Sequence, residues 1–183
     1  MAQQLKEGIG SLGALITYHR SDSNKMKKSE VDSLRQIISN DIGEIFLSKE
    51  EIIYKEKSKF VQQGHEAVTP THLQKKPEDV KKELNDDQFK LYDLIWKRTL
   101  ASQMTSAETN QNTLQIDCEE KNITLKATLG KLIFDGYKKV YNLQEDDEEQ
   151  IISLLENIKE NDKYTVSEVE ILESYTSPPS RYT

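Results

Sequence analysis

Cysteine is almost missing from this sequence, and long apolar runs are missing altogether. Cys118 is the only cysteine among 183 residues, so an internal disulfide is excluded and a reducing compartment is indicated. The apolar runs are only a few residues long, which excludes a transmembrane helix. Charged and amide residues interrupt residues 3–7, so the start of the chain has no signal-peptide pattern. A cytoplasmic location with no membrane partner is therefore expected.

Several motifs that carry chemistry are also missing. One cysteine and three scattered histidines do not make a recognisable zinc site. The sequence contains no phosphate-binding loop of the GxxxxGK[ST] type. A hydrolase triad of Ser21, His65 and Asp22 is conceivable, but no nucleophile elbow frames any serine. Tyrosine chemistry is the class that these exclusions leave.

A basic stripe is missing as well. The chain has 25 Lys and Arg against 32 Asp and Glu, which gives a formal net charge of -7. This balance argues against a free-standing nucleic-acid binder. The length suits one ordinary domain or two small ones with a real core.

Helical spacing of apolar residues is clear in the first part of the chain. Residues 2–7 are predicted to form a short helix closed by Gly8, too short to be stable alone and so the expected tail of a longer helix in an excised fragment. Ser29 is predicted to cap a helix that Gly43 ends, and Pro77 to begin a short helix through residue 84. The strongest helix is predicted over residues 86–104. The predicted apolar faces are Val31, Leu34, Ile37 and Ile38 in the second helix, with Ile42 as a further candidate, and Leu91, Leu94, Ile95, Leu100 and Met104 in the last.

Alternation replaces helical spacing after a polar stretch at residues 105–112. We place a boundary there, between a helical domain of residues 1–105 and a β portion of residues 106–183. Two strand faces are predicted, one of Leu114, Ile116 and Cys118 and one of Ile123, Leu125, Ala127 and Leu129.

Four smaller elements complete the prediction. They are a strand at residues 52–54, a hairpin turn at residues 134–137 that leads into a further run with Tyr137 and Val140, a short helix over residues 151–158 and a strand over residues 164–173. The predicted fold class is α+β, in which a helical part bearing a tyrosine loop precedes a mainly antiparallel β portion with one short helix.

The most unusual stretch is residues 15–23, with the sequence LITYHRSDS. Its apolar start predicts a brief buried strand, and its polar end predicts a loop that displays Tyr18. A tyrosine hydroxyl has a pKa near 10 in water, so a nucleophilic tyrosine needs its developing charge stabilised. Arg20 offers a planar fork for a phosphate, and Asp22 could orient a neighbouring group. His65, in a second unusual loop, titrates near neutrality.

These residues have a plainer interpretation too. Tyr18 could be an ordinary buried strand residue, Arg20 and Asp22 a surface ion pair, and His65 a loop histidine bonded to the backbone. Spacing alone favours this plain interpretation.

Four motifs, however, resemble those of the type IA DNA topoisomerase family, in the same order and from end to end of the chain. Residues 15–23 are similar to the family's active-site pattern [LY]-I-T-Y-M-R-T-D-S. Residues 64–71, GHEAVTPT, resemble its A-H-E-A-I-R-P-T loop. Residues 87–104 are similar to its D-x-x-[QR]-x-L-Y-x-L-I-W-x-R pattern followed by A-[SC]-Q-M, and residues 175–183 to its P-P-x-[RK]-[FY]-[ST] segment.

The resemblance implies an ATP-independent enzyme that relaxes negatively supercoiled DNA. Tyr18 would attack a phosphodiester of single-stranded DNA, form a 5'-phosphotyrosine link and later be displaced as the strand is resealed. The family's pattern assigns Tyr18, Arg20 and His65 to catalysis, and Arg20, His65, Asp22 and Ser23 to DNA contacts. The expected partners are single-stranded or negatively supercoiled DNA and the remaining domains of the same enzyme, which is expected to be a nucleoid-associated monomer.

The sequence departs from the family pattern at three positions. His19 stands in place of methionine, Ser21 in place of threonine, and Thr69 where many members have arginine. The loss of that arginine implies a weaker hold on DNA rather than lost chemistry.

The family's acidic Toprim domain, which binds Mg2+, has no match here. We therefore predict no metal ligand in this chain, Mg2+ bound elsewhere in the intact enzyme, and no DNA cleavage by this chain alone. A DNA groove shared among several domains would explain the acidic charge. The β portion resembles half of an arched β domain, so an exposed strand edge or a loosely ordered arch is expected.

Two other functions stay open: a non-catalytic acidic interaction module that kept the fold, and a topoisomerase III or reverse gyrase relative.

Overall fold

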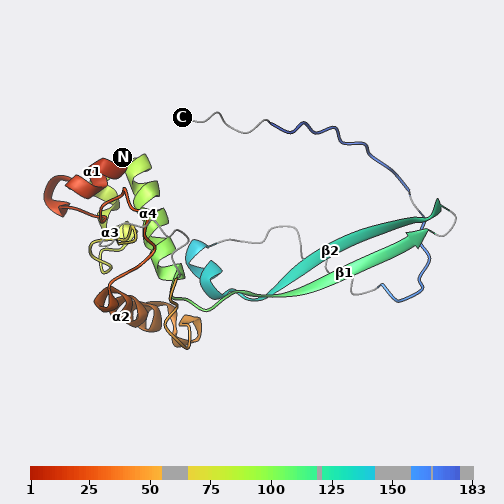
Figure 1. Cartoon of the computed structure of the whole chain (residues 1–183), viewed down its shortest axis with the longest axis horizontal. Helices are drawn as coiled ribbons and strands as arrows, with labels where there is room; N and C mark the ends of the chain where they lie inside the picture. The colour runs from red at the N-terminus through yellow and green to blue at the C-terminus, as the bar shows by residue number, and fades with distance from the viewer. Residues whose placement is uncertain (55–65, 119–120, 143–157, 166, 178–183) are drawn as a thin grey trace.

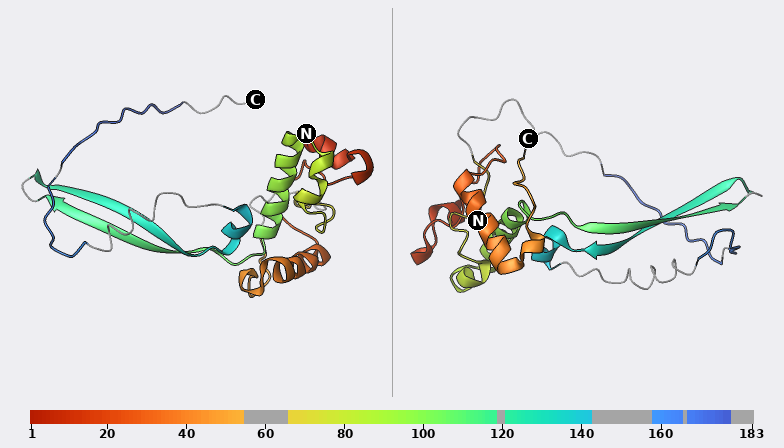
Figure 2. Two further views of the ribbon diagram at one scale, coloured as in Figure 1. Left: turned by 180° about the vertical axis from the view of Figure 1, so that it is seen from behind. Right: turned by 90° about the horizontal axis from the view of Figure 1, so that it is seen from below.

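The computed structural model describes residues 1–54, 66–118, 121–142, 158–165 and 167–177. It has the expected α+β class. Helices α1 to α4 gather at one end, and strands β1 and β2 project from them as a long twisted ribbon (Figure 1). Two further views show the same ribbon standing away from the helical part (Figure 2).

The central helix is α4, Asp86–Ala101. The Asn85 side chain accepts a hydrogen bond from the Gln88 backbone N–H at 2.9 Å, and the Gln88 side chain accepts one from the Asn85 N–H at 3.0 Å. This reciprocal pair fixes the start of the helix. The predicted helix is confirmed, although it ends three residues early. Leu94, predicted to be in the core, is 56% exposed, and Tyr92 is buried instead.

Two apolar clusters share α4 as their common wall. The first joins α1, Ala2–Glu7, and α3, Pro77–Val80, to α4. The second joins α2, Lys28–Ile37, to the end of α4. Trp96 packs against both, and its indole N–H donates to the Leu73 carbonyl at 3.1 Å. The clusters consist of Leu5, Leu15, Ile16, Val80 and Tyr92, and of Leu34, Ile38, Leu73, Leu100 and Met104.

The predicted cap of α2 is wrong by two residues. Lys27, not Ser29, precedes the first helical residue, and the Glu30 carboxylate accepts a hydrogen bond from the Lys27 backbone N–H at 3.3 Å. The carboxylate three residues on therefore decides where the helix begins. A π-helical turn, Ile38–Ile42, continues α2 and ends at Gly43, which has φ 128° as the glycine stop requires. Val31, Leu34 and Ile38 are buried, as the periodicity predicts.

Three short elements surround these helices. They are the 3₁₀ turns η1, Gly10–Leu12, η3, Glu44–Phe46, and η4, Lys81–Glu83. The helices predicted at residues 2–7 and after Pro77 are both present. Within the described residues, no helix is long and apolar enough to cross a bilayer.

The strand predicted at residues 52–54 is absent. Ile53 is 81% exposed, and the polar groups of Ile52 bond to a side chain rather than to a neighbouring strand. The Gln103 carboxamide accepts from the Ile52 N–H at 3.1 Å and donates to the Ile52 carbonyl at 2.9 Å. One buried glutamine thus replaces a strand partner.

The ribbon confirms the two predicted strands. Strand β1, Glu108–Cys118, pairs antiparallel with β2, Ile123–Phe134, and the register places Leu114 opposite Ala127 and Ile116 opposite Leu125. Directly paired residues share a face, so the two predicted faces form one apolar face. The sheet has two strands, which leaves each strand with an outer edge unpaired in the described chain, as expected.

The predicted hairpin at residues 134–137 is wrong. The turn between the strands lies near Asn122, and the 3₁₀ helix η6, Gly136–Tyr141, follows β2 in place of a further strand. Gly136 has φ 50° and lies against Ser106, and the Tyr137 N–H donates to the Thr105 carbonyl at 2.8 Å. The glycine therefore serves a close approach of two chain segments instead of a tight turn.

The last predicted elements have different outcomes. The helix predicted over residues 151–158 lies almost entirely outside the described residues. The described residues between 164 and 173 form no strand, and Val169 and Ile171 are exposed by 78% and 90%. The alternating pattern there has no strand partner in the described chain.

Candidate active site

Tyr18 lies at the end of a short extended segment that starts in the core. Leu15 and Ile16 are each 1% exposed, whereas Tyr18 is 51% exposed. The predicted buried strand is reduced to a single bridge between Ile16 and Pro70. Burial of the two apolar residues nevertheless fixes the segment and leaves the tyrosine ring accessible.

The second unusual loop lies beside this segment. The Thr17 N–H donates to the Thr69 carbonyl at 2.9 Å, and the Thr71 N–H donates to the Leu15 carbonyl at 3.0 Å. The Thr17 hydroxyl also donates to the Ala67 carbonyl and accepts from the Thr69 N–H, both at 3.0 Å. The Thr17 side chain thus replaces some of the backbone hydrogen bonds that would join two strands, which explains why the pairing does not extend beyond one bridge.

Hydrogen bonds also join the two segments on the C-terminal side of Tyr18. The Ser21 hydroxyl donates to the Glu66 carbonyl at 2.5 Å, and the Ala67 N–H donates to the Lys25 carbonyl at 2.7 Å. The Glu66 carboxylate lies 3.0 Å from Lys27 Nζ, and this contact raises the pKa of Lys27. Residues 14–27 and 66–71 are therefore held together on both sides of Tyr18.

The structure places four of the predicted site residues on one short stretch. Arg20 and Asp22 are exposed, and Ser23 accepts a hydrogen bond from the Lys25 N–H at 3.2 Å. His65 lies outside the described residues, but the next residue, Glu66, is the one bonded to Ser21. The catalytic and DNA-binding roles of these residues stay predictions.

Two side chains contact the Tyr18 ring, and sequence reasoning assigned neither of them a role. Lys6 Nζ lies 5.9 Å from the ring centroid. The His19 ring meets the Tyr18 ring edge-on with centroids 5.6 Å apart, and its buried Nδ1 has no hydrogen-bond partner among the described residues. Lys6 is twelve positions before Tyr18, so no local pattern could have linked them.

A cavity of about 500 Å³ opens beside the tyrosine segment. Ser23 and Asn24 form one side, residues 67–69 another and the end of α4 a third. Its remaining wall includes Ile52 and Tyr54. Its volume is within the range of small-molecule sites.

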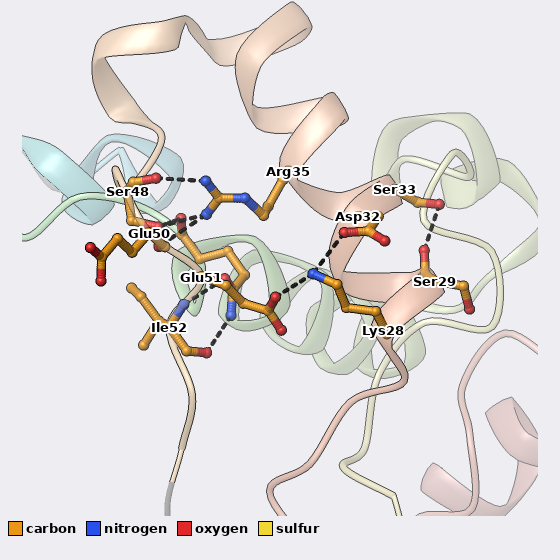
Figure 3. A network of polar contacts seen from close by, with 10 residues as sticks. Lys28, Ser29, Asp32, Ser33, Arg35, Ser48, Glu50, Glu51 and Ile52 are labelled. Carbon is orange, nitrogen blue, oxygen red and sulfur yellow. Dashed lines mark hydrogen bonds and ion pairs between the residues drawn. The ribbon is translucent and has the colours of Figure 1, made fainter.

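A polar network holds the Ile52 wall of this cavity (Figure 3). Arg35 reaches from α2 and donates to the Ser48 hydroxyl at 2.9 Å, the Ser48 carbonyl at 2.8 Å and the Glu50 carbonyl at 3.2 Å. Lys28 pairs with Asp32 and Glu51, and together these contacts tie residues 48–52 to α2.

The described residues do not provide a metal site. No group of three or more His, Cys, Asp or Glu among them could hold an ion. The carboxylate of Glu66, in the second unusual loop, is already paired with Lys27. A metal ion at this site would therefore need ligands from outside the described part of the chain.

Comparisons with known proteins agree along the whole chain. A model of the DNA topoisomerase family matches residues 1–183. The chain is 37% identical to DNA topoisomerase 1 of Rickettsia bellii and 38% identical to that of Helicobacter pylori, with all of this chain covered in both. It spans only 23% and 24% of the lengths of those relatives.

The fold is also found in a solved structure. Full-length topoisomerase I from Thermotoga maritima aligns with a TM-score of 0.64 and 35% sequence identity, over 79% of this chain and 23% of that one. The order of motifs, the fold and the family match agree, and the chain belongs to the DNA topoisomerase family.

Proposed function

We propose that this chain carries the nucleophilic tyrosine of a bacterial type IA DNA topoisomerase, an ATP-independent enzyme that relaxes negatively supercoiled DNA. The observation that carries the proposal is Tyr18, a half-exposed tyrosine on a segment fixed by the core and by residues 66–71. A reactive side chain needs this combination of access and rigid support.

The proposed step is an exchange of one phosphoester for another. The Tyr18 oxygen bonds to phosphorus, the bond from phosphorus to the 3' oxygen breaks, the tyrosine hydroxyl loses its proton and the 3' oxygen gains one. Resealing reverses each change, so no ATP is consumed. Arg20 is proposed to bind the phosphoryl oxygens, because charge builds up on them during transfer.

The other predicted residues complete the proposed site. His65 would support the reacting groups, and Asp22 and Ser23 would help to position the DNA. The family resemblance implies that magnesium would be bound by another domain of the intact enzyme. We propose single-stranded regions of supercoiled DNA in the bacterial cytoplasm as the substrate, and a monomer as the working form.

The test is Tyr18→Phe in the intact protein that contains this chain. We expect relaxation of negatively supercoiled plasmid and the covalent adduct with a labelled oligonucleotide both to vanish, while oligonucleotide binding changes less than about threefold. Tyr164→Phe is the matched control, because Tyr164 is exposed to a similar extent at 54%. Relaxation by the Tyr18→Phe protein would overturn the assignment. Binding without an adduct in the unaltered protein would favour a non-catalytic interaction module.

A further inference from the structure

Lys6 is fixed close to Tyr18 by the packing of α1. Its neighbour Leu5 is 0% exposed and belongs to the same apolar cluster as Leu15 and Ile16. The Leu15 N–H donates to the Leu5 carbonyl at 2.8 Å. The last turn of α1 is therefore joined to the tyrosine segment by a backbone hydrogen bond and by shared core packing.

The Lys6 ammonium is directed to the tyrosine ring. Its Nζ lies 5.9 Å from the Tyr18 centroid, at the outer limit of a cation–π contact. The carboxylate of the next residue, Glu7, accepts a hydrogen bond from the Gln3 side chain one turn earlier in α1. Gln3 and Glu7 are four residues apart and therefore neighbours on the surface of α1, so the Glu7 carboxylate has a partner within its own helix.

We propose that Lys6 is a phosphate-binding residue of the tyrosine site, an inference that rests on the proposed function. A phosphoryl group joined to the Tyr18 oxygen would lie at the hydroxyl end of the ring, and the centroid of that ring is 5.9 Å from Lys6 Nζ. The flexible lysine stem can carry a compact positive charge to that group, whereas the Arg20 guanidinium offers a fixed fork. Lys6 thus supplies a second cation beside the nucleophile, in a chain whose net charge is -7.

The experiment uses the intact protein with single-stranded oligonucleotide and compares Lys6→Met with Lys6→Arg. Methionine keeps an apolar, polarisable contact with the ring but removes the charge, whereas arginine keeps the charge. For Lys6→Met we expect the apparent Kd for the oligonucleotide to rise about 5- to 20-fold. We also expect the slope of log affinity against log salt to fall by about 0.7, the value for one lost contact to a single strand. Lys6→Arg should stay within about threefold of the unaltered protein.

Control measurements distinguish a failure of the Lys6 inference from a failure of the proposed function of Tyr18. Lys90→Met removes an exposed lysine from α4 and should change neither affinity nor salt slope. If the unaltered protein forms the Tyr18 adduct but Lys6→Met binds DNA with the same affinity and the same salt slope, Lys6 only supports the ring and the inference fails. An equal loss in Lys6→Arg and Lys6→Met would overturn it as well. If the unaltered protein forms no Tyr18 adduct, the proposed function fails first.

Discussion

Tyr92 connects the core of the helical part to the chain that precedes α3. Its side chain is 0% exposed, and its hydroxyl donates to the Lys75 carbonyl at 2.7 Å. Burial, helped by the negative charge of Asp79, raises the pKa of Tyr92 to about 12. The folded protein therefore holds this proton more tightly than the unfolded chain, in which the pKa is near 10.

We expect this difference to make stability depend on pH in the alkaline range. The contribution of Tyr92 is fully present below about pH 10 and is lost as the pH rises through about 12, because the unfolded chain releases the proton first. Urea unfolding at several pH values should show a loss of about 2–3 kcal/mol from this residue. In Tyr92→Phe, the free energy of unfolding should not show this decrease between about pH 10 and 12. If the two proteins have parallel pH profiles, the raised pKa is contradicted.

At the scale of elements, Gly136 joins the ribbon to the helical part. A Cβ atom at this position would lie 2.4 Å from the backbone carbon and oxygen of Ser106. Gly10 has nearly the same backbone angle, φ 51° against 50°, but a Cβ there would meet no atom of the described residues within 4 Å. The pair separates the cost of backbone conformation from the cost of crowding.

Gly136→Ala should therefore destabilise the chain more than Gly10→Ala. We expect about 1 kcal/mol for Gly10→Ala from the unfavourable positive φ alone. Gly136→Ala should cost about 3 kcal/mol or more, since η6 must also move away from Ser106. Unfolding midpoints in urea give both values. Equal losses would show that the contact with Ser106 is not tight.

Elements governed by nearby residues could be predicted from the sequence. The buried face of α2 and the existence of α4 follow from apolar spacing, and the ribbon strands follow from alternation. Elements whose conformation depends on residues far away in the sequence could not be predicted in this way. The conformation of residues 52–54 depends on hydrogen bonds with the Gln103 side chain, and Gly136 is required by its close approach to the Ser106 backbone. Neither partner can be read from a local window.

The candidate site divides in the same way. The motifs marked Tyr18, Arg20 and the loop of residues 64–71 as the proposed site, because each motif is a run of neighbouring residues. The Thr17 hydroxyl replaces ladder bonds to residues 67–69, and no spacing rule predicts this. Lys6 reaches the ring only because the core brings α1 and Leu15 together.

At the scale of the whole molecule, two properties bear on whether this chain can act on DNA alone: its net charge and the fraction of its relatives' length that it spans. Its net charge is -7, and it spans about a quarter of the length of its relatives. The described residues hold no metal cluster. Much of the affinity for DNA comes from Lys and Arg side chains that neutralise phosphates, and an acidic chain offers few cations that are not offset by carboxylates.

The isolated 183-residue chain is therefore expected not to relax negatively supercoiled plasmid with Mg2+ present. Its affinity for single-stranded oligonucleotide should be at least about 100-fold weaker than that of the intact protein at 150 mM salt. Gel-based relaxation and fluorescence anisotropy measure the two quantities. Relaxation by the isolated chain would show that its own residues suffice for the chemistry.

The bonds between Thr17 and residues 67–69 have a mechanical consequence. In the function proposed above, Tyr18 would hold a broken DNA strand and would bear the tension in that strand. Any pull on Tyr18 passes first to Thr17, which is anchored by its N–H and by its hydroxyl. Thr17 is in turn preceded by Leu15 and Ile16, which belong to the first apolar cluster. Under the function proposed above, this support would keep Tyr18 in place while it holds the cut strand.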